Sequence, residues 1–349
     1  MAGVASSTPA ESVTVVPYPS LFCQSHFRLS HAARDVPALR YAILYWKAFS
    51  NTSSPISPQK EPGVGNGLIK CDLTLETYFT YGNAAAVVTR PVLQRRPGQP
   101  IAMRGEIGIR DDGNFRPLVA HNTTHIDMPL HFLEHTADLE AVLNNPAYRI
   151  NLPMRARVLD LSTWPEAGCF YTQNGVRYCE RVSIEMLPTL EELQQYDALV
   201  LLTGFGAVMR QGSDSFHTDA EGFYHLPYIT VEVAQRVAAA GLALLAIDCT
   251  TVECQTQGQP LRMTGDVHPV LLGHEPPVFI LEGVAGDRIA PQAGCMPTEG
   301  VLEVIPRRTN PAGAEAAHAR VFLSFYRGPD NRQRLGQLLE MVTPEYLYG

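Results

Sequence analysis

Four side chains of metal-binding type lie close together in the stretch "HNTTHIDMPLH": His121, His125, Asp127 and His131. The whole chain has only 11 histidines in 349 residues, so this grouping calls for an explanation. Neutral imidazole nitrogens and carboxylate oxygens suit Zn²⁺, Mn²⁺ or Fe²⁺. Two histidines and one aspartate would leave coordination positions open for water, whose pKa a metal lowers towards about 7. The stretch is therefore a candidate metal site that could supply hydroxide near neutral pH.

The spacing of the four residues predicts their local conformation. On a helix they would not share a face, and Pro129 would break the helix. In an extended segment every spacing is even, so all four side chains lie on one side. A straight strand, however, would separate His121 from His131 by roughly 33 Å, too far for one metal ion. We therefore expect an extended segment that bends at residues 122–124 and at Pro129. Some of the four side chains are then expected to act near the metal without binding it directly.

The elements around this stretch form an α/β pattern. Apolar runs predict strands over residues 68–79, 155–162, 197–206, 242–248 and 277–284. Thr230 is expected to cap a helix over residues 231–241, with Val231, Ala234, Val237 and Ala238 on its apolar face. Residues 302–309 and 319–326 are expected to form a closing hairpin around "NPAGAEAAH". A strand, a helix and a buried strand in succession indicate an α/β protein.

Composition divides the chain into three parts. Residues 1–67 are rich in Ser, Pro and Gly and are expected to be an N-terminal extension and linker, with a short helix over residues 38–50. Residues 68–327 are expected to form one domain. Residues 328–349 are expected to be a C-terminal helical tail, in which "NRQRLGQLLEMV" is the helix.

The charge and cysteine content limit the partners and the location. A net charge of -8 argues against nucleic acid and acidic membranes, which leaves a small-molecule substrate as the expected partner. No apolar run of about 18 residues and no secretory signal pattern is present. The seven cysteines are scattered and form no CxxC pair, which favours reduced thiols. A cytoplasmic location is therefore expected.

The motif resembles the hallmark H-x-G-T-H-x-D-x-P-x-H-F of the cyclase family of metal-dependent hydrolases, which includes bacterial kynurenine formamidase and isatin hydrolase. Only Thr123, in place of the glycine, departs from it. The stretches "CDLTLET", "LLTGFG", "FYHLPYIT", "LLAIDCTTVE" and "VHPVLLGHEPPVFILEGV" resemble further family segments, in the same order. Tyr228 replaces a glycine in the third, and Glu253 stands at the final acid of the fourth. The resemblance covers about residues 68–326.

The resemblance implies a single α/β domain with a mixed central sheet or barrel-like β core flanked by helices, of the swivelling β/β/α type. It implies one or two divalent metal ions per subunit, zinc or manganese, and a homodimer or homotetramer. His131 would be the acid–base residue rather than a primary ligand. The implied metal ligands are His121, His125, Asp127, His268 and Glu282.

Four other residues are candidates for the site. Thr124 could hydrogen-bond a ligand or the substrate and is a candidate catalytic residue. Phe132, the last residue of the motif, and His225, in the loop before "LPYIT", are expected to contact the substrate. Asp248 ends a buried strand and is expected to act in the second shell, by hydrogen-bonding the loop that carries the ligands.

Three functions remain open from the sequence. The first is hydrolysis of an amide, lactam, lactone or ester bond in a small, aromatic or secondary-metabolite substrate by metal-activated water. The second is a cyclase, dehydratase or isomerase reaction in which the same site acts as a Lewis acid. This reading is favoured by the N-terminal extension, the inserted segment 164–178, Thr123 and Tyr228. The third is a metal that only stabilises the fold, although structural zinc sites are usually closed by four protein ligands, often cysteine, and no cysteine lies near the motif.

Overall fold

The computed structural model describes residues 68–74, 86–90, 106–111, 114–117, 124–133, 136–145, 147–164, 169–210, 219–257, 262–306 and 315–340. The predicted N-terminal extension with its helix, His121 and Thr123 lie outside these residues. Within the described ranges, none of the helices has the length and apolar character that a membrane span requires.

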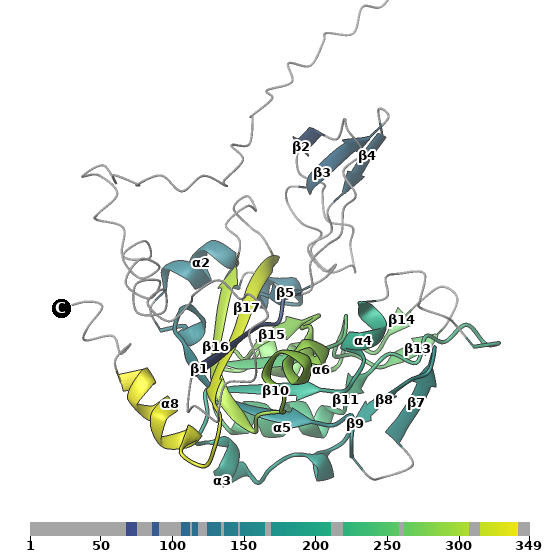
Figure 1. The fold of residues 1–349 in the computed structure, drawn as a ribbon. Helices are drawn as coiled ribbons and strands as arrows, with labels where there is room; N and C mark the ends of the chain where they lie inside the picture. The colour runs from purple at the N-terminus through teal and green to yellow at the C-terminus, as the bar shows by residue number, and fades with distance from the viewer. Residues whose placement is uncertain are drawn as a thin grey trace, which may run out of the picture.

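A mixed sheet forms the centre of the fold, and seven of its eight strands close into a ring (Figure 1). The ring closes because the long strand β17 pairs antiparallel with both β16 and β5. The expected barrel-like β core is thereby confirmed. The strands around the ring are β17 (Ala316–Tyr326), β16 (Glu299–Pro306), β6 (Met154–Asp160), β10 (Ala198–Leu202), β12 (Leu244–Ile247), β15 (Phe279–Glu282) and β5 (His125–Asp127), and β1 (Leu68–Asp72) pairs with β17 outside it.

Side chains from all seven strands of the ring fill its interior as one apolar cluster. In β10, Val200 faces this cluster, whereas Leu199 and Leu201 belong to a second cluster between the sheet and the helices. β10 lies parallel to β6 and β12, and a parallel strand that is buried on both faces needs an uninterrupted apolar sequence. The run "ALVLL" meets this requirement. Full burial of each Leu or Val contributes about 1.5–3 kcal/mol.

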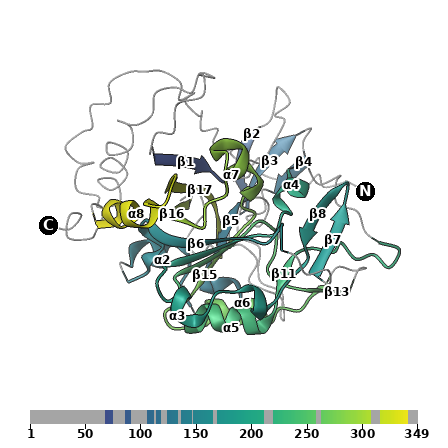
Figure 2. The same ribbon diagram turned by 60° about the horizontal axis from the view of Figure 1, so that its bottom comes forward.

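Helix α5 (Val231–Ala239) begins after Thr230, as predicted, and packs against α6 (Val267–Leu272). The two helices lie together on one side of the sheet in Figure 2. The predicted Ala234, Val237 and Ala238 are on the buried face of α5 together with Val233, and the predicted Val231, in the first turn, is partly buried against the same cluster. The C-terminal helix α8 (Asn331–Glu340) packs Leu335 against Val301 of β16.

The remaining elements surround this core. The predicted β16–β17 hairpin is present, and the inserted segment contains an antiparallel β7–β8 hairpin with an Asn-Gly turn, in which both residues have positive φ. The other elements are β2 (Ala86–Arg90), β3 (Glu106–Asp111), β4 (Asn114–Pro117), α2 (Leu139–Asn144), β7 (Phe170–Gln173), β8 (Val176–Cys179), β9 (Arg181–Val182), α3 (Leu190–Leu193), α4 (Gly206–Met209), β11 (Tyr228–Ile229), β13 (Gln255–Gln257), β14 (Arg262–Met263), α7 (Ile289–Ala293) and the 3-10 turns η2 (Pro129–His131), η3 (Arg149–Asn151), η5 (Ile184–Met186) and η7 (Gly286–Arg288).

Candidate metal centre

The register of β5 against β15 brings the first candidate ligands together. His125 lies opposite Glu282, and Ile126 lies opposite Leu281. Successive side chains of a strand point to opposite faces. Ile126 and Leu281 therefore fill the interior of the ring, while His125, Asp127 and Glu282 project from its outer face. All three are buried, although each is polar or charged.

The donor atoms of these three residues form one compact group. Nε2 of His125 lies 3.2 Å from Oε2 of Glu282 and 3.6 Å from Oδ1 of Asp127. The three donor atoms all lie within 4.8 Å of one another. His125 and Asp127 are two residues apart on an extended strand, as the parity of their spacing predicted.

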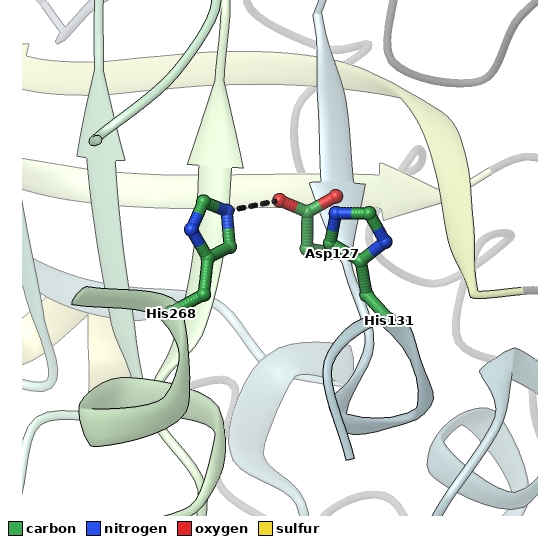
Figure 3. A group of neighbouring side chains, drawn as sticks. All are labelled: Asp127, His131 and His268. Carbon is green, nitrogen blue, oxygen red and sulfur yellow. Dashed lines mark ion pairs between the residues drawn. The ribbon is translucent and has the colours of Figure 1, made fainter. Parts of the chain in front are cut away.

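Helix α6 supplies His268 to a second group, made of Asp127, His131 and His268. Nε2 of His268 lies 3.4 Å from Oδ2 of Asp127 and 3.6 Å from Oε1 of Glu282. Figure 3 shows the Asp127 carboxylate between the two imidazole rings. Asp127 therefore belongs to both groups, and one oxygen of Asp127 is available to each.

The separations between these donor atoms fit a metal ion. Ligand atoms at about 2.0–2.2 Å from a tetrahedral ion are about 3.3–3.6 Å apart. The four distances above run from 3.2 to 3.6 Å. Imidazole nitrogens and carboxylate oxygens are also the ligands that zinc, manganese and iron accept. The residues therefore fit one or two divalent ions, one on each side of Asp127.

Glu253 fixes the orientation of His268. Its Oε1 lies 2.8 Å from Nδ1 of His268 and accepts hydrogen bonds from the main-chain nitrogens of His268 and Val267 at 2.9 and 3.0 Å. Its Oε2 accepts hydrogen bonds from the Thr264 hydroxyl at 2.5 Å and from the Asp266 nitrogen at 3.0 Å. Burial alone would raise the pKa of Glu253, but the hydrogen bonds, above all from His268, lower the pKa to about 2. An ionised Glu253 keeps the Nδ1 proton in place and leaves Nε2 facing Asp127.

The charge of the neighbouring carboxylates also affects His268 itself. Burial lowers the pKa of its imidazole, but hydrogen bonds to Asp127 and Glu253 and the charge of Glu282 outweigh burial and raise the pKa to about 9. In the metal-free protein the imidazole therefore carries a second proton at neutral pH. A metal ion bound at Nε2 would have to displace that proton.

A short turn brings His131 to the edge of the two groups. The extended segment ends at Met128, and the 3-10 turn η2 begins at Pro129, which confirms the predicted bend there. The main-chain nitrogen of His131 donates to the Met128 carbonyl at 2.9 Å. The His131 ring then meets the His268 ring edge-on, with 5.6 Å between their centroids.

A cavity of about 350 Å³ opens beside the centre. Phe132 lines it and stacks on His268, with the ring centroids 4.3 Å apart and the planes 20° apart. A small molecule in this cavity would therefore reach the metal-binding groups. The lining residues are His131, Phe132, Thr250, Thr251, Glu253, Met263, Gly265, His268 and Glu282.

Two predicted site residues hold the main chain around the centre. The buried hydroxyl of Thr124 donates to the Gly283 carbonyl at 2.6 Å and so ties the start of β5 to the end of β15. Asp248 accepts hydrogen bonds from the hydroxyl and nitrogen of Thr203 and from the nitrogens of Gly204 and Gly206. In the described part of the chain these bonds stabilise the turn after β10 and reach no candidate ligand. The catalytic role of Thr124 and the second-shell role of Asp248 stay predictions.

His225 is held in a cluster of its own. Its Nδ1 lies 2.9 Å from Oε1 of Glu180, its Nε2 lies 3.0 Å from Oδ2 of Asp219, and its ring stacks on Tyr171 with the centroids 4.0 Å apart. Burial, the largest single effect, lowers the pKa of His225, but the hydrogen bonds and charges of Glu180 and Asp219 together raise it. His225 is not among the residues that line the cavity, whereas Phe132 is. The substrate contact of His225 stays a prediction.

Two carboxylates near the centre were absent from the predicted set. Glu253 could have been found, because it stands at the final acid of the family-like segment "LLAIDCTTVE". Glu315 comes just before β17, and its Oε2 lies 3.4 Å from Nδ1 of His131. It belongs to the predicted turn "NPAGAEAAH", where nothing local indicates a site.

The chain was compared with known protein families, with curated proteins and with solved structures. The profile of a family described as "Putative cyclase" matches residues 46–254. No curated protein matches the chain. Among solved structures, a potential metal-dependent hydrolase with cyclase activity is 20% identical, with 75% of this chain and 100% of that chain covered and a TM-score of 0.45. Isatin hydrolase A from Labrenzia aggregata, bound to benzyl benzoate, is 19% identical over 74% and 93% of the chains, with a TM-score of 0.44.

A third solved structure is a predicted metal-dependent hydrolase from Bacillus stearothermophilus. It is 18% identical over 74% of this chain and 98% of that chain, with a TM-score of 0.40. The matched family segment contains the motif and ends one residue after Glu253, so His268 and Glu282 lie beyond it.

Proposed function

Because the chain belongs to the cyclase family, we propose that it is a metal-dependent hydrolase that cleaves an amide, lactam, lactone or ester bond in a small molecule. The observation that supports this most strongly is the position of the two donor groups, which share Asp127 and border a cavity. His131, His268 and Glu282 all line that cavity. A substrate carbonyl placed there would be within reach of both the metal ligands and a proton carrier.

The metal ligands that we propose are His125, Asp127, His268 and Glu282, together with His121, which lies outside the described residues. A divalent ion, when bound, supplies Lewis acidity, which polarises a carbonyl group and makes water more acidic. Zinc and manganese both suit these ligands. With His131 kept as a proton carrier, the second donor group retains Asp127 and His268, and Glu282 lies 3.6 Å from His268, so the ligands could hold one or two ions per subunit.

His131 is the residue that we propose to move the proton. Hydrolysis adds hydroxide to the acyl carbon and a proton to the leaving nitrogen or oxygen. His131 lines the cavity and is partly exposed, so its imidazole could take a proton from water and return it to the leaving atom. Phe132 stacks on the ring of the buried His268 and lines the cavity beside it.

The test uses zinc-loaded and manganese-loaded protein in H₂¹⁸O with four probes: an N-formyl arylamine, isatin, an aromatic lactone and phenyl acetate. The proposal predicts that at least one probe gives a carboxylic acid that contains one ¹⁸O atom. It also predicts that His131→Ala lowers the rate by about 10²–10⁴-fold, the usual contribution of an acid–base residue.

His274→Ala is the matched control, because His274 is partly exposed, lies outside the cavity and contacts the Pro276 carbonyl through its Nδ1. This variant should keep the wild-type rate. The proposal would be wrong if the loaded protein acted on none of the four probes, or if the acid products contained no label.

A second function deserves the same experiment, because the family description names a cyclase. The same centre could act as a Lewis acid for a cyclisation, dehydration or isomerisation. An unlabelled product whose mass equals that of the substrate, or is lower by one water, would favour this function over hydrolysis.

We also propose that the protein assembles as a homodimer or homotetramer, as the family resemblance implies. Light scattering on the eluted protein would measure its mass directly, and a single species of about 38 kDa, the mass of one chain, would contradict the proposal.

A further inference from the structure

We propose that Glu315 is a positioning residue for His131, which holds the imidazole with Nδ1 towards Glu315 and Nε2 towards Asp127. The proton-carrying role of His131 rests on the proposed function, but the orientation of its ring does not. The contact that carries the inference is the 3.4 Å between Nδ1 of His131 and Oε2 of Glu315.

The main chain brings the two residues together. β17 pairs with β5 so that Ala316 lies opposite Asp127, and the ladder continues with the nitrogen of Met128 donating to the Glu315 carbonyl at 2.8 Å. The carbonyl of the same Met128 accepts a hydrogen bond from the nitrogen of His131. The main chain of Met128 is therefore hydrogen-bonded to both partners.

The His131 and Glu315 side chains face each other in a part of the protein that is largely closed to water. The side chain of Glu315 is 6% exposed and that of His131 is 14% exposed, so little water separates the two groups. Charge interactions are stronger where water is excluded. A carboxylate beside Nδ1 favours the tautomer with the proton on that nitrogen, as in other histidines that a carboxylate orients.

The second nitrogen of the ring then faces the centre. Figure 3 shows one ring nitrogen of His131 turned towards the Asp127 carboxylate and the other turned away from it. Because Nδ1 meets Glu315, Nε2 is the nitrogen on the Asp127 side. Glu315 is not among the residues that line the cavity, so it acts through His131 rather than on a substrate.

The first test reads the tautomer of His131 by ¹⁵N NMR of zinc-loaded protein labelled at histidine, with His131→Ala to assign the signal. We expect wild type to show the proton on Nδ1, and Glu315→Ala to show a mixture or the Nε2 tautomer. An unchanged His131 signal in Glu315→Ala would overturn the proposal. This measurement needs no substrate, so it judges Glu315 even if the proposed hydrolysis fails.

The second test compares two probes, acetanilide and p-nitrophenyl acetate. The amine of acetanilide needs a proton to leave, whereas p-nitrophenolate leaves without one. Glu315→Ala and Glu315→Gln should therefore lose about 10- to 100-fold in kcat on acetanilide and much less on the ester, with zinc content unchanged. If wild type acts on neither probe, the tautomer measurement alone decides the positioning role, and the four-probe experiment decides the hydrolase function.

Glu315→Gln is the deciding variant if Glu315→Ala does not fold. Its amide oxygen can still accept the Nδ1 proton, so the tautomer should be kept, but the negative charge beside Nδ1 is gone. Glu303→Gln is the matched control, because Glu303 is an equally buried glutamate on β16 that pairs with Lys70 outside the site. If Glu315→Gln behaves like Glu303→Gln on both probes, the proposal is wrong.

Discussion

Oε1 of Glu253 lies 2.8 Å from Nδ1 of His268, and this contact determines which nitrogen of His268 faces Asp127. Metal-binding histidines usually donate their second ring N–H to a carboxylate or carbonyl, which fixes the tautomer. Here the same carboxylate also accepts hydrogen bonds from the main chain at the start of α6. One side chain therefore orients the helix, its histidine and the nitrogen that we propose as a metal ligand.

Glu253→Gln should weaken metal binding. A glutamine can accept the Nδ1 proton with only one oxygen, and its NH₂ group would face donors that now meet Oε2. Loss of such a carboxylate typically costs 10–100-fold in metal affinity, so about that loss is expected, measured by competition with a chelating dye. Glu303→Gln should bind metal as wild type does, because the Glu303 carboxylate that it replaces pairs with Lys70. Equal affinities for the two variants would refute the role of Glu253.

Asp127→Asn should reduce binding at both metal positions at once. Asp127 is the only residue shared by the two donor groups of the described residues. Removal of a metal ligand should reduce the metal affinity by more than the 10–100-fold that is typical when a residue hydrogen-bonded to a ligand is lost. His268→Ala, by comparison, should affect one position, so the metal content by mass spectrometry should separate the two variants.

The control for this substitution is Asp248→Asn, which neutralises another buried aspartate. Because Asp248 supports the turn after β10, its variant should lose stability but keep its metal content. Loss of metal from Asp248→Asn would instead support the second-shell role predicted from the sequence.

Thr124→Val should destabilise the protein by about 1–3 kcal/mol. The substitution keeps the shape of the side chain but leaves the buried Gly283 carbonyl without the hydroxyl that now donates to it at 2.6 Å. Thr124→Ser keeps the hydroxyl and should retain most of the stability, as urea unfolding of both variants would show. If Thr124→Val were as stable as wild type but lost turnover per folded molecule, the hydroxyl would act in catalysis instead.

His225→Gln should lower stability more at low pH than at high pH. The folded protein raises the pKa of His225 above its ordinary value of 6.5, so the protonated imidazole is stabilised between Glu180 and Asp219. That contribution is fully present below the unfolded pKa and is lost as the pH rises through the folded pKa. Because all three side chains are about a quarter exposed, we expect a difference of about 1 kcal/mol or less.

The measurement is the free energy of unfolding in urea of wild type and of His225→Gln, at about pH 6 and at about pH 9. The loss of stability caused by the substitution should be larger at about pH 6. The partly exposed His274 offers the control, since the oxygen that its ring contacts belongs to the Pro276 carbonyl, which carries no charge. A His225→Gln effect that did not shrink with rising pH would contradict the prediction.

Local spacing was enough to predict much of the site. Even spacing put His125 and Asp127 on one face of an extended strand, and the fixed φ of Pro129 predicted the bend that follows. The start of α5 after Thr230 and the buried run of β10 were also predicted, because such patterns depend only on neighbouring residues, although the Thr230 side chain makes no capping hydrogen bond with the helix. The family resemblance, carried by the motif, is confirmed by the family match.

Contacts between distant segments could not be predicted in this way. The strand register puts Glu282 opposite His125, and closure of the ring brings Glu315 beside His131, from positions more than 150 residues away along the chain. Such pairings depend on how β5, β15 and β17 align with one another. The sequence of one strand does not fix its register against the next strand. The residue types determined what the centre could bind, and the alignment of three strands decided which side chains reach it.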